Sequence, residues 1–176
     1  MKNNLIFKRL DKSDITEAQF KQIVEVEQSD GNDGYTEEQL KSIWIEDKKD
    51  DNFVCIHNNK IVAHISFNPK SKRRNGSVYM VNLMVSPEYR KMGIAQNLIF
   101  TACKFYMQKG ETLPMSLSVD KDNTKAINLY QKVGYEIKDP ICEVDEDDEQ
   151  YIMEVSLPTL KQNLKNLLGL NEKVKQ

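Results

Sequence analysis

The sequence predicts a single α/β domain, and two observations support this fold class. Strand-like and helix-like apolar patterns alternate along the chain, and no internal repeat interrupts them. The 176 residues are enough for one domain with a sizeable core, since 39% of them are apolar and 30% are charged. This composition also excludes a disordered chain.

The first half of the chain is predicted to contain four strands and two helices. The expected strands span residues 5–9, 53–57, 61–68 and 78–85. One helix is expected over about 13–27, and Thr36 with Gln39 forms a capping-box pattern that begins the second. Residues 58–60, Asn-Asn-Lys, are a hairpin signal between the second and third strands.

The second half continues the alternation. A third helix is expected over about 93–108, where apolar residues recur at helical spacing. Asp122 or Asn123 can cap a fourth helix, and Gly134 ends it. The remaining strands are expected at 113–119, 135–138 and 151–157.

Residues 1–157 are predicted to form the domain, and residues 158–176 a C-terminal amphipathic helical tail. The apolar side of the tail is a leucine stripe made of Leu157, Leu160, Leu164, Leu167, Leu168 and Leu170. Such a helix packs either on its own domain or on a second subunit, so a homodimer is an open alternative.

Charge and residue usage limit the partners and the location. A formal net charge of −2 argues against nucleic acid as a partner. The N-terminus lacks a signal-peptide pattern, and no run of about 18 apolar residues predicts a membrane span, so we expect a cytoplasmic protein without a membrane partner. Cys55, Cys103 and Cys142 lie far apart without C-x-x-C spacing, and the two histidines are His57 and His64. Neither a disulfide framework nor a metal site is therefore expected.

The most informative segment is residues 85–95, which we call the cradle loop. It follows a predicted strand, turns through Pro87 and begins a helix, whose first backbone N–H groups lack helical partners and favour an anion. Arg90 offers a planar fork to phosphate oxygens and Lys91 a mobile charge. Gly93 lets a ligand approach the backbone. These features predict a pyrophosphate site.

Two motifs in this order resemble the GNAT superfamily of N-acetyltransferases over roughly residues 5–157. The first is R-x-x-G-x-A, with Arg90, Gly93 and Ala95, after a strand. The second resembles N-x-x-A-x-x-x-Y-x-x-x-G-F/Y and consists of Asn123, Ala126, Tyr130, Gly134 and Tyr135. The resemblance implies an α/β (α+β) fold with a mixed, mostly antiparallel twisted sheet with a splay, flanked by about four helices and a C-terminal helix. The splay would lie between the strand before the cradle loop and the strand after the third helix.

The resemblance also implies acetyl-coenzyme A (acetyl-CoA) as cosubstrate and no metal. The cradle loop would hold the pyrophosphate, and the backbone of the preceding strand the pantetheine and thioester end. The residues expected to bind the cosubstrate are Leu83, Met84, Val85, Arg90, Lys91, Met92, Gly93, Ile94, Ala95, Asn123 and Tyr130. We expect Tyr130 to be the catalytic acid that protonates the departing thiolate, because a phenol is protonated at neutral pH. A backbone N–H, that of Val85, would stabilise the oxyanion.

The general base is left open by the sequence. Some members of the superfamily carry an acidic residue on the strand before the cradle loop, whereas residues 78–85 contain none. Either the amine arrives deprotonated, or water carries the proton, or Glu27, Glu46 or His64 accepts it. Alternation places His64 on one strand face with Val62 and Ser66.

The acceptor is expected to be a primary amine on a small cationic molecule. The resemblance implies that two segments border its site, and both are acidic here, one containing Asp30, Asp33, Glu37 and Glu38, the other Glu143, Asp145, Glu146, Asp147, Asp148 and Glu149. The alternatives are solvated acidic loops with no such role, a protein acetyltransferase acting on an N-terminal amine or a lysine, and a non-catalytic acyl-CoA-binding regulatory module.

Overall fold

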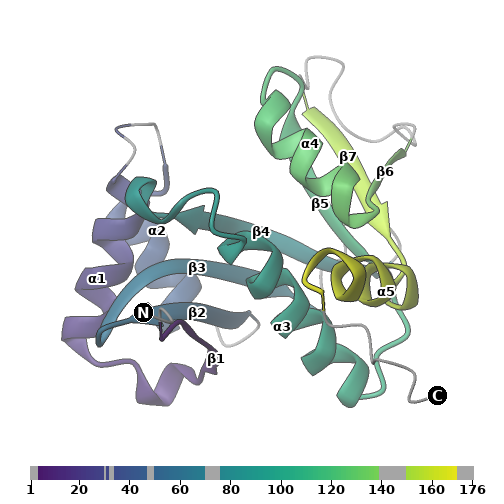
Figure 1. Cartoon of the computed structure of the whole chain (residues 1–176). Coiled ribbons are helices and arrows are strands. Elements are labelled where there is room, and N and C mark those ends of the chain that lie inside the picture. Colours follow the sequence, from purple (N-terminus) through teal and green to yellow (C-terminus); the bar gives the residue numbers. More distant parts are fainter. Residues whose placement is uncertain are drawn as a thin grey trace.

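The computed structural model describes residues 4–29, 31, 34–46, 50–69, 76–138 and 150–169. Within these ranges it has one sheet with helices on both faces (Figure 1). The strands are β1 (Ile6–Leu10), β2 (Asp51–His57), β3 (Lys60–Asn68), β4 (Val78–Val85), β5 (Met115–Asp120), β6 (Glu136–Lys138) and β7 (Gln150–Val155). The helices are α1 (Glu17–Gln28), α2 (Glu37–Lys41), α3 (Ile94–Gln108), α4 (Thr124–Val133) and α5 (Leu157–Leu167).

The strands are ordered β1-β2-β3-β4-β5-β7-β6, and all neighbouring pairs are antiparallel except β4 with β5. That parallel pair extends over only two residues of each strand, Val78 with Met115 and Tyr79 with Ser116. Beyond Tyr79 the two strands diverge, and β5, β7 and α4 rise as a separate arm (Figure 1). The predicted fold, a mixed and mostly antiparallel sheet with a splay, is confirmed.

A β-bulge in β4 coincides with this divergence. Ser66 of β3 pairs with Asn82 and Phe67 pairs with Met80, so Val81 is an extra residue in β4. A bulge bends its strand and reverses which face each later side chain occupies. Val78 and Met80 before the bulge pack on the α3 side, and Leu83 and Val85 after it pack on the same side. Even-numbered positions beyond the bulge therefore face α1.

A second bulge in β3 corrects one expectation. Cys55 pairs with Ala63 and Ile56 pairs with Ile61, so Val62 is the extra residue. Val62 consequently packs on the α3 side, whereas His64 points to the α1 side with Ser66. The expected alternation of Val62 with His64 is wrong, because a simple period of two does not hold across a bulge.

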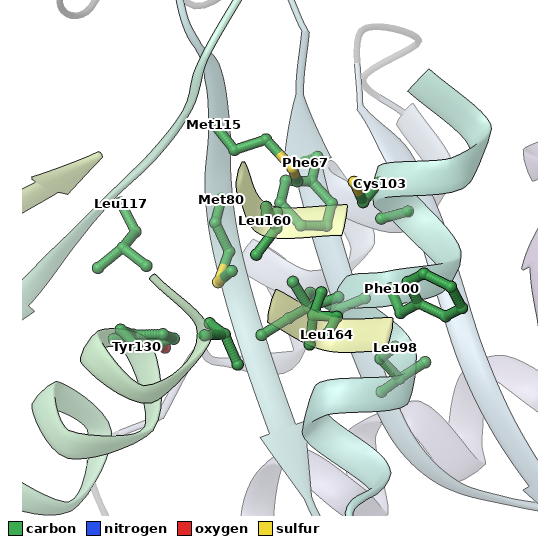
Figure 2. Packing of buried hydrophobic residues seen from close by; sticks show 14 of the residues in the cluster. Phe67, Met80, Leu98, Phe100, Cys103, Met115, Leu117, Tyr130, Leu160 and Leu164 are labelled. Carbon is green, nitrogen blue, oxygen red and sulfur yellow. The ribbon is translucent and has the colours of Figure 1, made fainter. Parts of the chain in front are cut away.

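Two apolar clusters cover the two faces of the sheet. The larger one joins the sheet to α3, α4 and α5, and Figure 2 shows Leu160 and Leu164 of α5 reaching the same cluster as Phe67 and Phe100. The smaller one joins β1–β3 to α1 and α2 around Ile23, Leu40 and Trp44. The sheet is thus the middle layer of the molecule.

Helix α5 packs on its own chain. Leu157, Leu160 and Leu164 are buried in the larger cluster, whereas Leu167 is 39% exposed. Leu170, the last residue of the leucine stripe, lies outside the described residues. Complete burial of three leucines stabilises the domain by roughly 5–9 kcal/mol before entropy costs.

Local signals fixed several boundaries as expected, and one helix starts later. Thr36 and Gln39 form the predicted capping box, and Asn58 and Asn59 take the positive φ values of a tight hairpin turn, 48° and 63°. Helix α1 begins only at Glu17 rather than near residue 13, because Thr16 supplies its own capping box and a short 3-10 turn precedes it.

Two thiols, Cys55 and Cys103, are free and buried, and burial raises their pKa to about 11 and about 12. Cys142 lies outside the described residues. In the part of the chain that the structure describes, none of the helices is long and apolar enough to cross a bilayer.

Candidate active site

A cleft of about 190 Å³ lies where β4 and β5 diverge. Its lining comes from β4, β5, the start of β7 and α4: Met80, Val81, Asn82, Leu83, Leu117, Ser118, Val119, Asp120, Asn123, Ala126, Tyr130 and Gln150. Figure 2 shows Met80, Leu117 and Tyr130 converging from these elements. The bulge and the short β4–β5 pairing together create this space, because a continuous ladder would close it.

The edge of β4 that borders the splay carries backbone groups that β5 does not use. Ser86 N donates to Val62 O of β3 at 3.0 Å. Alternate residues of a strand direct their N–H and C=O groups to opposite neighbours, so Leu83 and Val85 direct theirs away from β3, toward the open side. Met84 is paired with His64 of β3, and its side chain packs on the α1 side. Of the three expected strand residues, the open edge therefore presents Leu83 and Val85.

The cradle loop has the backbone shape of an anion site. Lys91 and Gly93 take left-handed conformations, with φ of 62° and 74°. The first helical hydrogen bond of α3 runs from Asn97 N to Gly93 O, at 3.1 Å. The N–H groups of Ile94 and Ala95 therefore have no helical acceptor, and they lie at the positive end of the helix dipole. The side chain of Ile94 is buried in the core, so only its backbone is available to a ligand.

Side-chain contacts anchor the cradle loop at its beginning. Arg90 Nε donates to Val85 O at 3.1 Å, which folds its exposed guanidinium over the end of β4. Tyr89 OH lies 3.0 Å from His57 Nδ1, and this contact ties the loop to the β2–β3 hairpin. Lys91 and Met92 are exposed. The loop is thus fixed on the strand side and open on the solvent side.

Helix α4 brings the two residues of the second motif to the same cleft. Asn123 caps the helix, since its Oδ1 accepts from Ala126 N at 3.2 Å. Tyr130 lies two turns later and lines the cleft with it. Gly134 ends the helix with φ of 106°, and a Cβ there would collide with Asn163 of α5.

Tyr130 is only 9% exposed, and its ring meets that of Tyr135 edge-to-face at 5.7 Å. Burial, together with nearby Tyr79, raises the pKa of Tyr130 to about 12. Its phenol therefore stays protonated throughout the neutral and moderately basic range.

The candidates for a general base occupy different environments. Glu46 is exposed, 3.8 Å from Lys41. Glu27 and His64 come together, with Glu27 Oε2 3.1 Å from His64 Nε2, although the two atoms are not aligned for a hydrogen bond. Both side chains are almost completely buried, at 2% and 0% exposed. The second acidic segment lies outside the described residues, as do Asp30 and Asp33 of the first.

Sequence reasoning missed Asn82. Its Nδ2 donates to Glu27 Oε2 at 2.8 Å, and the residue is among those that line the cleft. The available signal was a carboxamide within the otherwise apolar and aromatic strand VYMVNLMV. Its orientation was not predictable, because the bulge at Val81 decides which face Asn82 occupies.

The comparisons agree with this geometry. Residues 19–135 match the acetyltransferase (GNAT) family, whereas no curated protein sequence matches the chain. The ribosomal-protein-S18-alanine N-acetyltransferase of Escherichia coli is similar in structure, with a TM-score of 0.68, 18% identity, and coverage of 87% of this chain and 94% of the other. NAA60 of Arabidopsis thaliana in complex with acetyl-CoA is similar with a TM-score of 0.67 and 15% identity, covering 88% of this chain and 99% of the other. An aminoglycoside 6'-acetyltransferase type Ii is similar with a TM-score of 0.68 and 15% identity, covering 86% of this chain and 97% of the other. With two thirds of its length matched and the splayed sheet in place, this chain belongs to the GNAT acetyltransferase family.

Proposed function

We propose that this protein transfers an acetyl group from acetyl-CoA to a primary amine by direct attack in a ternary complex. The observation that carries the proposal is the continuity of two binding surfaces. The unpaired edge of β4 at Leu83 and Val85 leads directly into the cradle loop, whose N–H groups precede Asn97. An extended amide-containing arm suits the first surface, and a pyrophosphate suits the second.

The reaction that follows from this placement is a simple acyl transfer. The nitrogen lone pair of the neutral amine attacks the thioester carbonyl carbon, the carbon–sulfur bond breaks, the nitrogen releases one proton to water, and an amide and a thiol are formed. Acetyl-CoA supplies the activated acyl group. We assign the N–H of Val85 to the carbonyl oxygen, which gains negative charge during attack.

Tyr130 is assigned to the leaving group. The departing thiolate takes the phenolic proton, and the phenol later regains one from solvent. Its raised pKa keeps the phenol protonated at neutral pH, so the proton is present when the sulfur leaves. Asn123 and Tyr130 share one wall of the cleft, so cosubstrate binding and protonation come from the same helix.

The acceptor is proposed to be a small cationic amine. Among the described residues that line the cleft, the charged one is Asp120, and it accepts from Gln150 Nε2 at 2.7 Å. Glu37 and Glu38 begin α2 on the α1 side of the sheet. An acidic surround attracts cations and raises their encounter rate.

The proposal is tested by incubating the protein and acetyl-CoA with polyamines, aminoglycosides, amino acids and basic peptides while free thiol is measured. Thiol release with a small amine supports it. Release only with peptides would instead identify a protein acetyltransferase, and stabilisation by coenzyme A without release on any acceptor would identify a binding module. Absence of any calorimetric signal with acetyl-CoA would contradict all three.

The contribution of the second acidic segment has its own test. Neutralising Glu146, Asp147 and Asp148 to their amides should raise the acceptor KM at low salt and have less effect at high salt, because screening removes long-range attraction. An unaltered KM at low salt would remove the steering role and leave the transferase assignment intact.

A further inference from the structure

A buried carboxylate lies directly behind the cleft. Glu27, near the end of α1, is 2% exposed. Its Oε2 accepts from Asn82 Nδ2 at 2.8 Å, and its Oε1 accepts from Tyr35 N at 3.1 Å. One side chain thus connects α1, the segment before α2 and the β4 edge of the cleft.

Glu27 fixes the orientation of the Asn82 amide. An ionised carboxylate can only accept hydrogen bonds, so the amide must turn its nitrogen toward Glu27 and its oxygen away. Asn82 Oδ1 has no protein partner among the described residues, and it is not buried. This carbonyl oxygen therefore remains as an acceptor on a residue that lines the cleft.

Asn82 precedes Leu83, whose backbone faces the open edge of β4. The side chain of Leu83 packs on the α3 side of the sheet, and the side chain of Asn82 lies on the α1 side. A molecule held by the Asn82 oxygen thus approaches the β4 edge from the α1 side. Tyr130 approaches from the α3 side, because α4 belongs to the larger cluster. Asn82 and Tyr130 therefore reach the cleft beside β4 from opposite faces of the sheet.

The protein keeps a buried carboxylate at a position where an apolar side chain could serve folding equally well. Removing a carboxylate from water is unfavourable, and a well-packed apolar side chain of similar volume is often at least as stable. Nearby buried polar atoms, Ser66 Oγ and both amide atoms of Asn52, have no hydrogen-bond partner among the residues described. An arrangement optimised only for folding would not keep these groups.

We propose that Asn82 Oδ1 accepts a hydrogen bond from the N–H of the attacking amine, and that Glu27 is the positioning residue that holds Asn82 in this orientation. The inference rests on the proposed function. As the nitrogen attacks, it gains positive charge, so a hydrogen bond to a carbonyl backed by a carboxylate strengthens during the reaction. The carboxylate that is absent from β4 itself is supplied by α1.

Glu27→Gln tests the positioning role with little change in shape. The introduced amide can turn a donor toward Asn82, which removes the constraint on Oδ1. We expect kcat/KM for the acceptor to fall by about 10- to 100-fold, the cost of one hydrogen bond to a charging group, while the Kd for coenzyme A stays within about twofold. The matched control is Glu25→Gln on the same helix, which should leave both values unchanged. Glu25 is exposed, and its Oε2 lies 3.7 Å from Lys60 Nζ. An unaltered kcat/KM in Glu27→Gln would overturn the inference.

A rescue experiment separates positioning from a general structural role. In the double variant Glu27→Gln with Asn82→Asp, the introduced amide nitrogen donates to the introduced carboxylate, whose second oxygen again serves as an acceptor. We expect it to recover at least about tenfold of the loss in kcat/KM. If the losses in kcat/KM of the two single variants multiply in the double variant, the inference is contradicted. Asn82→Leu, at a half-buried position, should lose the same activity if Glu27→Gln does not fold.

A binding measurement makes the two proposals separately testable. In the native protein saturated with coenzyme A, titration with the amines of the acceptor panel should shift the NMR signals of the Asn82 side-chain NH₂ group, and Glu27→Gln should weaken that response. Coenzyme A binding without any response of Asn82 would overturn the inference. Thiol release with an unresponsive Asn82 would do so while supporting the proposed function.

Discussion

The two faces of β4 differ in chemistry although they belong to the same eight residues. On the α3 side, Val78, Met80, Leu83 and Val85 enter a continuous apolar cluster. On the α1 side, Asn82 meets a buried carboxylate and a row of polar groups on β2 and β3. The extra residue Val81 decides which of these two environments each later side chain of β4 enters.

The comparison breaks most severely if the register of β4 is shifted beyond the bulge. An alanine inserted between Asn82 and Leu83 would turn Leu83 toward Glu27 and Met84 into the apolar cluster, so we expect a loss of more than about 4 kcal/mol in the free energy of unfolding. Val81→Ala keeps the register and should cost only about 1 kcal/mol. Chemical denaturation measures both, and equal losses would contradict the faces given to the side chains of β4.

The apolar side is tested next through α5. Leu160 is completely buried, so Leu160→Ala should destabilise the domain by about 3 kcal/mol. Leu167→Ala, on the same helix but 39% exposed, should cost less than about 0.5 kcal/mol. If the two variants melt alike, α5 does not contribute to the core in the way described.

Tyr130→Phe tests the chemistry that the apolar side contributes. Removing the phenolic proton should lower kcat about 100-fold and leave the Kd for coenzyme A unchanged. In the native protein the raised pKa, about 12, keeps the phenol protonated, so kcat should show no alkaline fall from this group up to about pH 10. Equal kcat in both proteins across the pH range would remove the acid assignment.

Two glycines that flank α3 allow a matched test of the cradle loop. Gly93 begins the helix with φ of 74° and Gly110 follows it with φ of 77°, so alanine at either should cost about 1 kcal/mol of stability. Only Gly93→Ala should also raise the KM for acetyl-CoA, because its Cβ would lie beside the N–H groups that we propose to bind the pyrophosphate. A comparable rise in Gly110→Ala would attribute the effect to stability alone.

The smallest expected effect concerns pH and the polar side. Burial acts to raise the pKa of Glu27, but His64, Asn82 and the Tyr35 N–H outweigh it and lower the pKa below the ordinary value of 4.5. A carboxyl group whose folded pKa is lowered stabilises the protein above its unfolded pKa and loses this effect as pH falls through the folded value. Native protein should therefore exceed Glu27→Gln in stability at neutral pH, and the difference should shrink below about pH 4.5. A difference that grows in acid would contradict the lowered pKa.

The sequence was sufficient for whatever depends on neighbours along the chain. The capping box at Thr36, the hairpin at Asn58 and the helix end at Gly134 each follow from a few adjacent residues. The two motifs, separated by about thirty residues, were enough to predict the splayed fold and to propose one wall of the cleft. In these places the local backbone preference and the tertiary fold agree.

The sequence could not show which face of β4 each side chain occupies. That depends on Val81 and Val62, which become extra residues only when β3 is paired with both of its neighbours. A period-of-two reading placed Val62 with His64, and it gave no reason to connect Asn82 with Glu27, 55 residues earlier.

The sequence by itself therefore determined the elements, their caps and the family. Only the tertiary structure decided that Asn82 faces a buried carboxylate from α1 and that Leu83 and Val85 present the free edge. The physical reason is that strand register is a property of paired strands, and a one-residue offset reverses the faces of all later residues.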